Sequence, residues 1–230
     1  MIFSNKRNPP NMQISFNDMT IDRVDHHNFL GVLIDNNLNF KYHIQHICSK
    51  VSKAVGILFK LSSYMPSNIL KIIYHALVTP YITYCVTVWG CAPRYLINKL
   101  FIQQKKLVRI IAGATYFAHT DPLFSSLKIL KLSDLYELRC LIFIFKVFNC
   151  VSNHYVIEYI SSYQIPHNHE TRNQIVRLPI VNLFKYRQSV IYKSVNLWND
   201  LSVNIKSANS IYALKRLFST CKFLKYDNQT

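Results

Sequence analysis

The spacing of hydrophobic residues changes partway along the chain. Before Asp35, three short stretches at Met12–Phe16, Thr20–Val24 and Phe29–Ile34 are rich in apolar residues and are separated by polar, turn-forming positions. Stretches of this length, bounded by turn residues, are typical of β-strands. The pattern therefore predicts a small antiparallel β meander over residues 1–36.

After Asp35 the hydrophobic period lengthens to about 3.6 residues, as in an amphipathic helix. The first predicted helix has one apolar face, formed by Ile44, Ile47, Val51, Val55, Leu58 and Leu61, and one basic face, formed by His46, Lys50, Lys53 and Lys60. Further helical runs extend from Ser67 to Trp89, with a break expected at Pro80, and from Arg94 to Ala112, where Gly113 ends the run. We expect a helical bundle over residues 37–115.

The remainder of the chain is also predicted to be helical. Helical patterns cover Ser133–Cys150, Tyr186–Trp198 and Ser210–Tyr226, and Ala118–Pro122 is predicted to be a connector. These runs predict a helical C-terminal extension over residues 116–230. The expected fold class is mainly α, with a short β meander at the N-terminus.

The charge balance changes the picture most. The chain has 27 Lys and Arg residues against 11 Asp and Glu residues, a net charge of +16. Between Asn36 and Thr120 there is no acidic residue, but there are ten basic ones: Lys41, Lys50, Lys53, Lys60, Lys71, Arg94, Lys99, Lys105, Lys106 and Arg109. An excess of this kind favours a polyanionic partner such as nucleic acid.

Two of the predicted helices place basic residues opposite an apolar face. The candidate nucleic-acid-binding residues are Lys50, Lys53, Lys60, Lys105, Lys106 and Arg109. A solvated charged face is the alternative interpretation. Tyr64, Tyr74 and Trp89 could stack on bases, but their helical spacing within an apolar run favours the core.

Catalytic and metal sites are not indicated. Polymerases that use two metal ions need clustered carboxylates, whereas Asp18, Asp22 and Asp25 would alternate between the faces of a hairpin. We assign no catalytic residue.

Metal ligation by histidine and cysteine is equally weakly supported. His43 and His46 could share a helix face, but Cys48 would lie on another side and no fourth ligand is apparent. His167 and His169 are predicted to lie in a polar loop. No phosphate-binding glycine motif occurs, so we expect neither a metal nor a cofactor.

The six cysteines form no CxxC pair and no secretory signal is present, which favours an intracellular protein of the nucleus, the cytoplasm or both, and not a secreted one. Residues Ile72–Gly90 carry no charge over nineteen positions, which raises the possibility of a membrane helix. His75 and Pro80 favour a buried, broken core helix instead, and no membrane is expected as a partner.

Several ordered blocks resemble the region after the polymerase centre in reverse transcriptases of non-LTR (LINE-type, Jockey-like) retrotransposons. The blocks are FLGVLIDNNLNFKYHI, KVSKAVGILFKLSSYMP, IIYHALVTPYITYCVTVWG, QQKKLVRIIAG, DPLFSSLKIL, TRNQIVRLP, SVNLWNDLS and ALKRLFSTCKFL. They span about Met12 to Leu224. The resemblance implies that residues 1–36 are the edge of a polymerase palm and that residues 37–115 are a thumb.

The same resemblance implies roles and partners. Phe29, Leu30 and Gly31 match the strand beside the primer. The partners would be RNA, DNA or their hybrid, and an upstream polymerase chain. The family's catalytic aspartates and endonuclease lie outside the matched blocks, so the resemblance implies that this chain alone is not an enzyme and that Mg²⁺ would belong to the missing catalytic part.

The expected function is therefore that of a truncated reverse transcriptase fragment without the polymerase active site, which retains nonspecific binding of template and primer. The alternative is a non-binding, unstable relic or a membrane-associated helical protein.

Overall fold

The computed structural model describes residues 1, 3, 14–17, 19–149, 155, 158 and 184–228. The predicted polar loop with His167 and His169 lies outside these residues. The chain divides into two compact units, the first made of residues 1–85 and 92–107 and the second of 86–91 and 108–230. The three-part division with borders at 36 and 115 stays a prediction.

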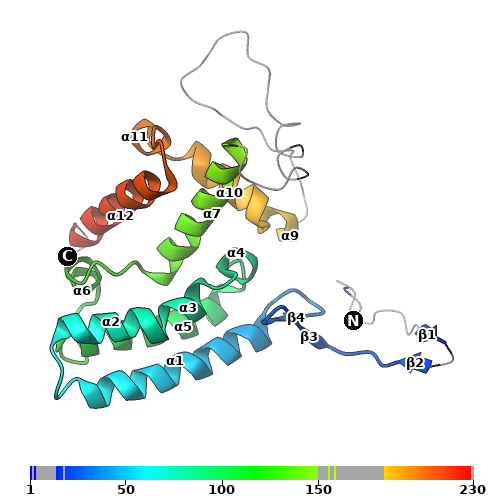
Figure 1. Cartoon of the computed structure of the whole chain (residues 1–230), viewed down its shortest axis with the longest axis horizontal. Coiled ribbons are helices and arrows are strands. Elements are labelled where there is room, and N and C mark those ends of the chain that lie inside the picture. The colour runs from blue at the N-terminus through cyan, green and yellow to red at the C-terminus, as the bar shows by residue number, and fades with distance from the viewer. Residues whose placement is uncertain are drawn as a thin grey trace, which may run out of the picture. The chain divides into compact units, whose positions relative to one another are not determined.

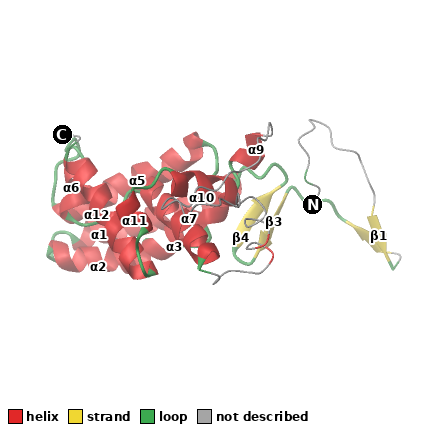
Figure 2. Ribbon diagram, turned by 90° about the horizontal axis from the view of Figure 1, so that it is seen from above, coloured by secondary structure: helices red, strands yellow, loops and turns green. Residues whose placement is uncertain are grey.

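Two separate hairpins replace the predicted meander. Strand β1 (Ile14–Phe16) pairs with β2 (Met19–Ile21), and β3 (His26–Phe29) pairs with β4 (Val32–Asp35), both antiparallel. Figure 2 shows the strands in yellow. The described strands thus form two separate two-stranded sheets and not one continuous sheet.

The segment Phe29–Ile34 is not one strand, as its apolar character suggested. The chain reverses at Leu30 and Gly31, whose φ angles are 47° and 81°. Two successive residues with positive φ are what a tight two-residue hairpin turn requires. The hydroxyl of Tyr84 donates a hydrogen bond of 2.6 Å to the carbonyl oxygen of Leu30. A residue 54 positions away therefore stabilises the turn.

The first unit is dominated by helices α1 (Lys41–Leu61), α2 (Ser67–Leu77), α3 (Thr79–Thr83) and most of α5 (Arg94–Ala112) (Figure 1). The predicted break near Pro80 is confirmed, because α2 ends at Leu77 and Pro80 lies in the first turn of α3. The predicted end of α5 is also confirmed, since Gly113 follows it with φ of 63°.

The core of this unit comes from the predicted apolar faces. Its most deeply buried side chains include Ile44, Val51, Leu58, Leu70, Tyr74, Leu96, Leu100 and Leu107. Gln104 is also buried, and its amide donates to the hydroxyl of Tyr74 at 3.0 Å, which joins α5 to α2. Burial raises the pKa of Tyr74 to about 12.

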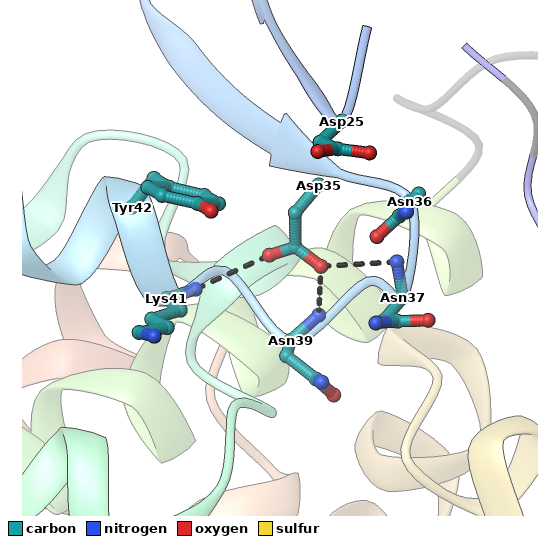
Figure 3. Close-up of a pocket in the computed structure, with 7 residues that line it drawn as sticks. All are labelled: Asp25, Asp35, Asn36, Asn37, Asn39, Lys41 and Tyr42. Carbon is teal, nitrogen blue, oxygen red and sulfur yellow. Dashed lines mark hydrogen bonds between the residues drawn. The ribbon is translucent and has the colours of Figure 1, made fainter. Parts of the chain in front are cut away.

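The start of α1 is fixed by one carboxylate. Asp35 is 4% exposed, and its two oxygens accept hydrogen bonds from three backbone amides: those of Asn37 at 3.1 Å, Asn39 at 2.9 Å and Lys41 at 3.2 Å (Figure 3). Lys41 is the first residue of the helix, whose unpaired amides favour a negative charge. Asp35 therefore caps α1 from the end of β4.

The loop that carries these amides is strained. Leu38 and Phe40 have φ angles of 53° and 55°, in the left-handed region that large L-residues rarely occupy. Phe40 is nevertheless buried. The hydrogen bonds to Asp35 and the burial of Phe40 offset the unfavourable backbone conformation.

The second unit contains α4 (Val86–Trp89), α6 (Asp121–Ser126), α7 (Leu132–Phe148), α9 (Phe184–Arg187), α10 (Val190–Asn199), α11 (Val203–Lys206) and α12 (Ile211–Asp227). Helix α7 packs against α10 and α12, and α12 also packs against α6 (Figure 1). Their shared core includes Leu141, Ile144, Val195, Trp198, Leu214 and Phe218. Ala118–Pro122 is not wholly a connector, because α6 begins at Asp121 with Pro122 in its first turn.

A polar cluster fastens α12 to α7. The ammonium of Lys222 lies 2.6 Å from both the Asp134 and Glu137 carboxylates, and the Tyr226 hydroxyl donates to the other oxygen of Asp134. These hydrogen bonds raise the pKa of Lys222 despite its partial burial. Asp134 and Glu137 are thus engaged within the fold of the second unit.

The uncharged stretch Ile72–Gly90 is divided among α2, α3 and α4. None of the helices within the described ranges has the length and apolar character needed to cross a bilayer.

Replacing Asp35 by Ala should destabilise the start of α1, because three backbone amides lose their hydrogen-bond acceptor. We expect a loss of about 3 kcal/mol in the local stability of α1, measured as faster hydrogen–deuterium exchange of peptides from the helix. The variant Asp35→Asn should lose less of this local stability, because the side-chain oxygen of asparagine can still accept hydrogen bonds from the backbone amides of Asn37 and Asn39.

The matched control is Asp25→Ala. Asp25 is exposed and contributes its backbone carbonyl, which accepts from the Asn36 amide at 3.0 Å. Its replacement should change the exchange of α1 by less than about 0.5 kcal/mol. Equal effects of the two alanine variants would contradict the capping role of the Asp35 carboxylate.

Candidate nucleic-acid interface

Helix α1 presents the predicted basic face to solvent. His46, Lys53 and Lys60 are exposed and Lys50 is half-buried. Of the residues predicted to face inward, four are buried and two are half-buried: Ile44, Ile47, Val51 and Leu58 are buried, and Val55 and Leu61 are half-buried. The helix therefore separates its charges from its core contacts as its sequence indicates.

Helix α5 carries the second basic set. Lys106 is exposed, while Lys105 is half-buried with its ammonium 4.7 Å from the centre of the Phe101 ring. These two residues belong to the first unit, whereas Arg109 belongs to the second. Arg109 donates from Nε to the carbonyl oxygen of Ala118 at 3.0 Å, so it also has a structural role.

Neither set of lysines is neutralised within the described part of the chain. No carboxylate there lies within ion-pair distance of Lys50, Lys53, Lys60, Lys105 or Lys106. Ion pairs elsewhere include Lys131 with Asp121, and Lys222 with Asp134 and Glu137. The cause is visible in the sequence, since no acid occurs between Asn36 and Thr120. The charges of α1 and α5 remain available to a ligand.

The three residues matched to a primer-side strand lie at the β3–β4 turn. Phe29 is 60% exposed and Leu30 is 77% exposed, and Gly31 lies against the ring of Tyr84. The side chains of Phe29 and Leu30 are therefore not buried in a core formed by the described residues. A role beside a primer stays a prediction.

The aromatic residues considered for stacking divide into two groups. Tyr74 and Trp89 are buried, in agreement with the core interpretation. Tyr64 is 84% exposed, so placing it in the core was wrong. It lies after the last turn of α1, where the chain changes direction before α2 and the helical spacing no longer holds.

A shallow pocket of about 290 Å³ adjoins the Asp35 cap and is lined by Asp25, Asp35, Asn36, Asn37, Asn39, Lys41 and Tyr42 (Figure 3). The Asp35 oxygens are already engaged by backbone amides. Within the described ranges, no three His, Cys, Asp or Glu side chains gather into a possible metal site. The described residues therefore do not fit a pair of Mg²⁺ ions.

His43 helps to join β4 to α1. It is buried, and its Nδ1 accepts a hydrogen bond from the Leu33 amide at 3.4 Å. Burial, and to a smaller extent the neighbouring His46, lowers the pKa of His43 to about 4. The imidazole is thus neutral near pH 7. This role was missed, although a histidine on the apolar side of a predicted helix was the available signal.

Comparison with known proteins finds homologues among polymerases of non-LTR retrotransposons. The chain is 30% identical over 125 residues to the RNA-directed DNA polymerase from mobile element jockey of Drosophila funebris, which is 53% of the chain and 14% of the relative. The jockey polymerase of Drosophila melanogaster is 30% identical over 126 residues, with the same coverage.

A third relative is the probable RNA-directed DNA polymerase from transposon X-element of Drosophila melanogaster, 29% identical over 133 residues, which is 56% of the chain and 14% of the relative. The matched part of the chain thus covers a small share of each polymerase. No family model and no solved structure matches the chain.

The homology confirms the resemblance to polymerases of non-LTR retrotransposons over about half of the chain. It corrects one expectation. The sequence suggested that the chain is not an enzyme, but its homologues are named RNA-directed DNA polymerases, which are enzymes.

The His43 environment predicts a pH dependence of stability. The pKa is about 4 in the folded chain and about 6.5 when unfolded, so the unfolded chain binds more protons between these values. The free energy of unfolding should therefore be highest above about pH 6.5, and it should fall by at most about 3 kcal/mol as the pH drops to 4.

Urea unfolding followed by circular dichroism at several pH values measures this change. The variant His43→Gln should lose most of the pH dependence, whereas His46→Gln, at an exposed position on the same helix, should keep it. The same decline in wild type and in His43→Gln would show that another group is responsible.

Proposed function

We propose that this chain binds nucleic acid as part of RNA-directed DNA synthesis by a non-LTR retrotransposon polymerase. Binding would be electrostatic and independent of sequence, with RNA, DNA or their hybrid as the ligand. The observation that carries the proposal is that no carboxylate among the described residues forms an ion pair with Lys50, Lys53, Lys60, Lys105 or Lys106 of α1 and α5. The polymerase homologues supply the context.

The arrangement suits a phosphate backbone for physical reasons. Lys53, Lys60 and Lys106 are exposed on helices whose opposite sides are buried, so ligand binding need not disturb the core. Each phosphate that a lysine neutralises releases condensed counterions, which makes affinity depend on salt. Phosphate contacts of this kind fix position without reading sequence.

The finer assignment belongs to the same proposal. The β3–β4 turn at Phe29, Leu30 and Gly31 would lie on the primer side of a palm, and α1 to α5 would form the thumb. Exposure of Phe29 and Leu30 is compatible with contact to further parts of a polymerase, because an isolated two-stranded hairpin is only marginally stable. An upstream polymerase chain would be the partner.

Neutralising the basic faces tests the proposal. A variant in which Lys50, Lys53, Lys60, Lys105 and Lys106 are replaced by Gln should bind an RNA/DNA hybrid about a hundredfold more weakly at 0.1 M salt. The slope of log affinity against log salt should decrease by about one per lost contact. Fluorescence anisotropy with a labelled hybrid measures both quantities.

The matched control removes the same charge from exposed sites of the second unit: Arg139, Lys146, Lys215, Arg216 and Lys225, each replaced by Gln. Its affinity should stay within about threefold of wild type, because salt at this concentration screens charges that make no direct contact with a phosphate. Equal losses in the two variants would refute a localised interface and leave only a net-charge effect.

A further inference from the structure

A short turn after α5 is held in a defined conformation by its backbone. Gly113 ends the helix with its amide donating to Ile110 at 3.2 Å, and the Ala118 amide donates to the Thr115 carbonyl at 3.1 Å. The second bond closes a β-turn whose two central residues are Tyr116 and Phe117. We refer to residues 115–118 as the aromatic turn.

The aromatic turn directs two large rings into solvent. Tyr116 is 69% exposed and Phe117 is 91% exposed. Their ring centres are 5.2 Å apart and the ring planes are perpendicular, a favourable edge-to-face geometry. The pair is therefore mutually ordered, yet most of its apolar surface is left without a partner among the described residues.

Arg109 anchors this turn and gives it a positive charge. Its Nε donates to the Ala118 carbonyl at 3.0 Å, and its guanidinium lies 6.0 Å from the centre of the Tyr116 ring. The nearest acid in the sequence, Asp121, is paired with Lys131 at 2.9 Å. Arg109 forms no ion pair with a carboxylate of the described residues, so a cation lies beside the exposed rings.

We propose that the aromatic turn binds unpaired nucleobases of single-stranded RNA or DNA by stacking on Tyr116 and Phe117, with Arg109 attracting the adjacent phosphate. This inference rests on the proposed function and adds a strand preference to it. Aromatic side chains beside a positive charge are the combination that single-stranded nucleic acids recognise, and stacking tolerates any base sequence. The lysines of α1 and α5 would contact only phosphates, so they would not distinguish single strands from duplexes.

The test compares two labelled ligands: a blunt RNA/DNA hybrid, and the same hybrid with a single-stranded extension that contains 2-aminopurine. In the variant Tyr116→Leu/Phe117→Leu, apolar bulk remains but stacking is lost. Its affinity for the extended hybrid should fall about tenfold, as expected for the loss of one stacked base. Its affinity for the blunt hybrid should change less than twofold.

The control is Tyr212→Leu, at another exposed aromatic position of the second unit (76% exposed), which should bind both ligands as wild type does. Quenching of 2-aminopurine by wild type, and not by the double variant, would support stacking directly. Circular dichroism of each variant checks that the fold is retained.

The outcomes separate the two proposals. If wild type binds both ligands and the double variant matches it on the extended hybrid, the aromatic turn has no role in binding and only this inference fails. If wild type binds neither ligand, the proposed function fails as well. Loss of binding to phosphatidylserine vesicles without loss on the extended hybrid would overturn the inference in favour of a lipid surface.

Discussion

The Asp35 carboxylate is the interaction on which the first unit depends. It ends β4, accepts from three amides of the following loop and occupies the amino end of α1. The loop between them holds Leu38 and Phe40 in left-handed conformations. The hydrogen bonds to the Asp35 side chain offset this strain together with the burial of Phe40 and a backbone hydrogen bond of 3.0 Å from the Leu38 amide to the Asp35 carbonyl oxygen. The direction in which α1 leaves the hairpin is set here.

The orientation of α1 then determines where its lysines lie. Burial of Ile44, Ile47 and Val51 leaves Lys53 and Lys60 on the solvent side. Asp35 is also the last acid before Asp121. The first unit therefore uses its nearest carboxylate for backbone capping, and none of its described carboxylates forms an ion pair with the lysines of α1 and α5. In the second unit, by contrast, a lysine is neutralised within the fold, because Asp134 and Glu137 form ion pairs with Lys222.

The sequence was sufficient for features that depend on local spacing. The period of about 3.6 located α1 and α5, and Pro80 and Gly113 marked a break and an end. It failed where distant residues decide. The turn at Leu30 depends on Tyr84, and nothing near Leu30 signals its positive φ apart from the adjacent Gly31.

At the candidate interface, too, features set by local spacing could be predicted, and features set by longer-range contacts could not. Exposure of the lysines followed from helical periodicity and the missing acids. The structural bond of Arg109 to Ala118 did not, because it depends on how the chain turns after Gly113. Exposure of Tyr64 was also missed, since the residue lies beyond the helix whose spacing was extended to it.

Lysine footprinting can show whether a nucleic acid lies on the basic faces of α1 and α5. The chain is acetylated with and without a saturating RNA/DNA hybrid, and modified residues are quantified by mass spectrometry. We expect Lys53, Lys60 and Lys106 to become protected while Lys146, Lys215 and Lys225 stay reactive. Protection of the second set alone, or of neither set despite binding, would contradict this expectation.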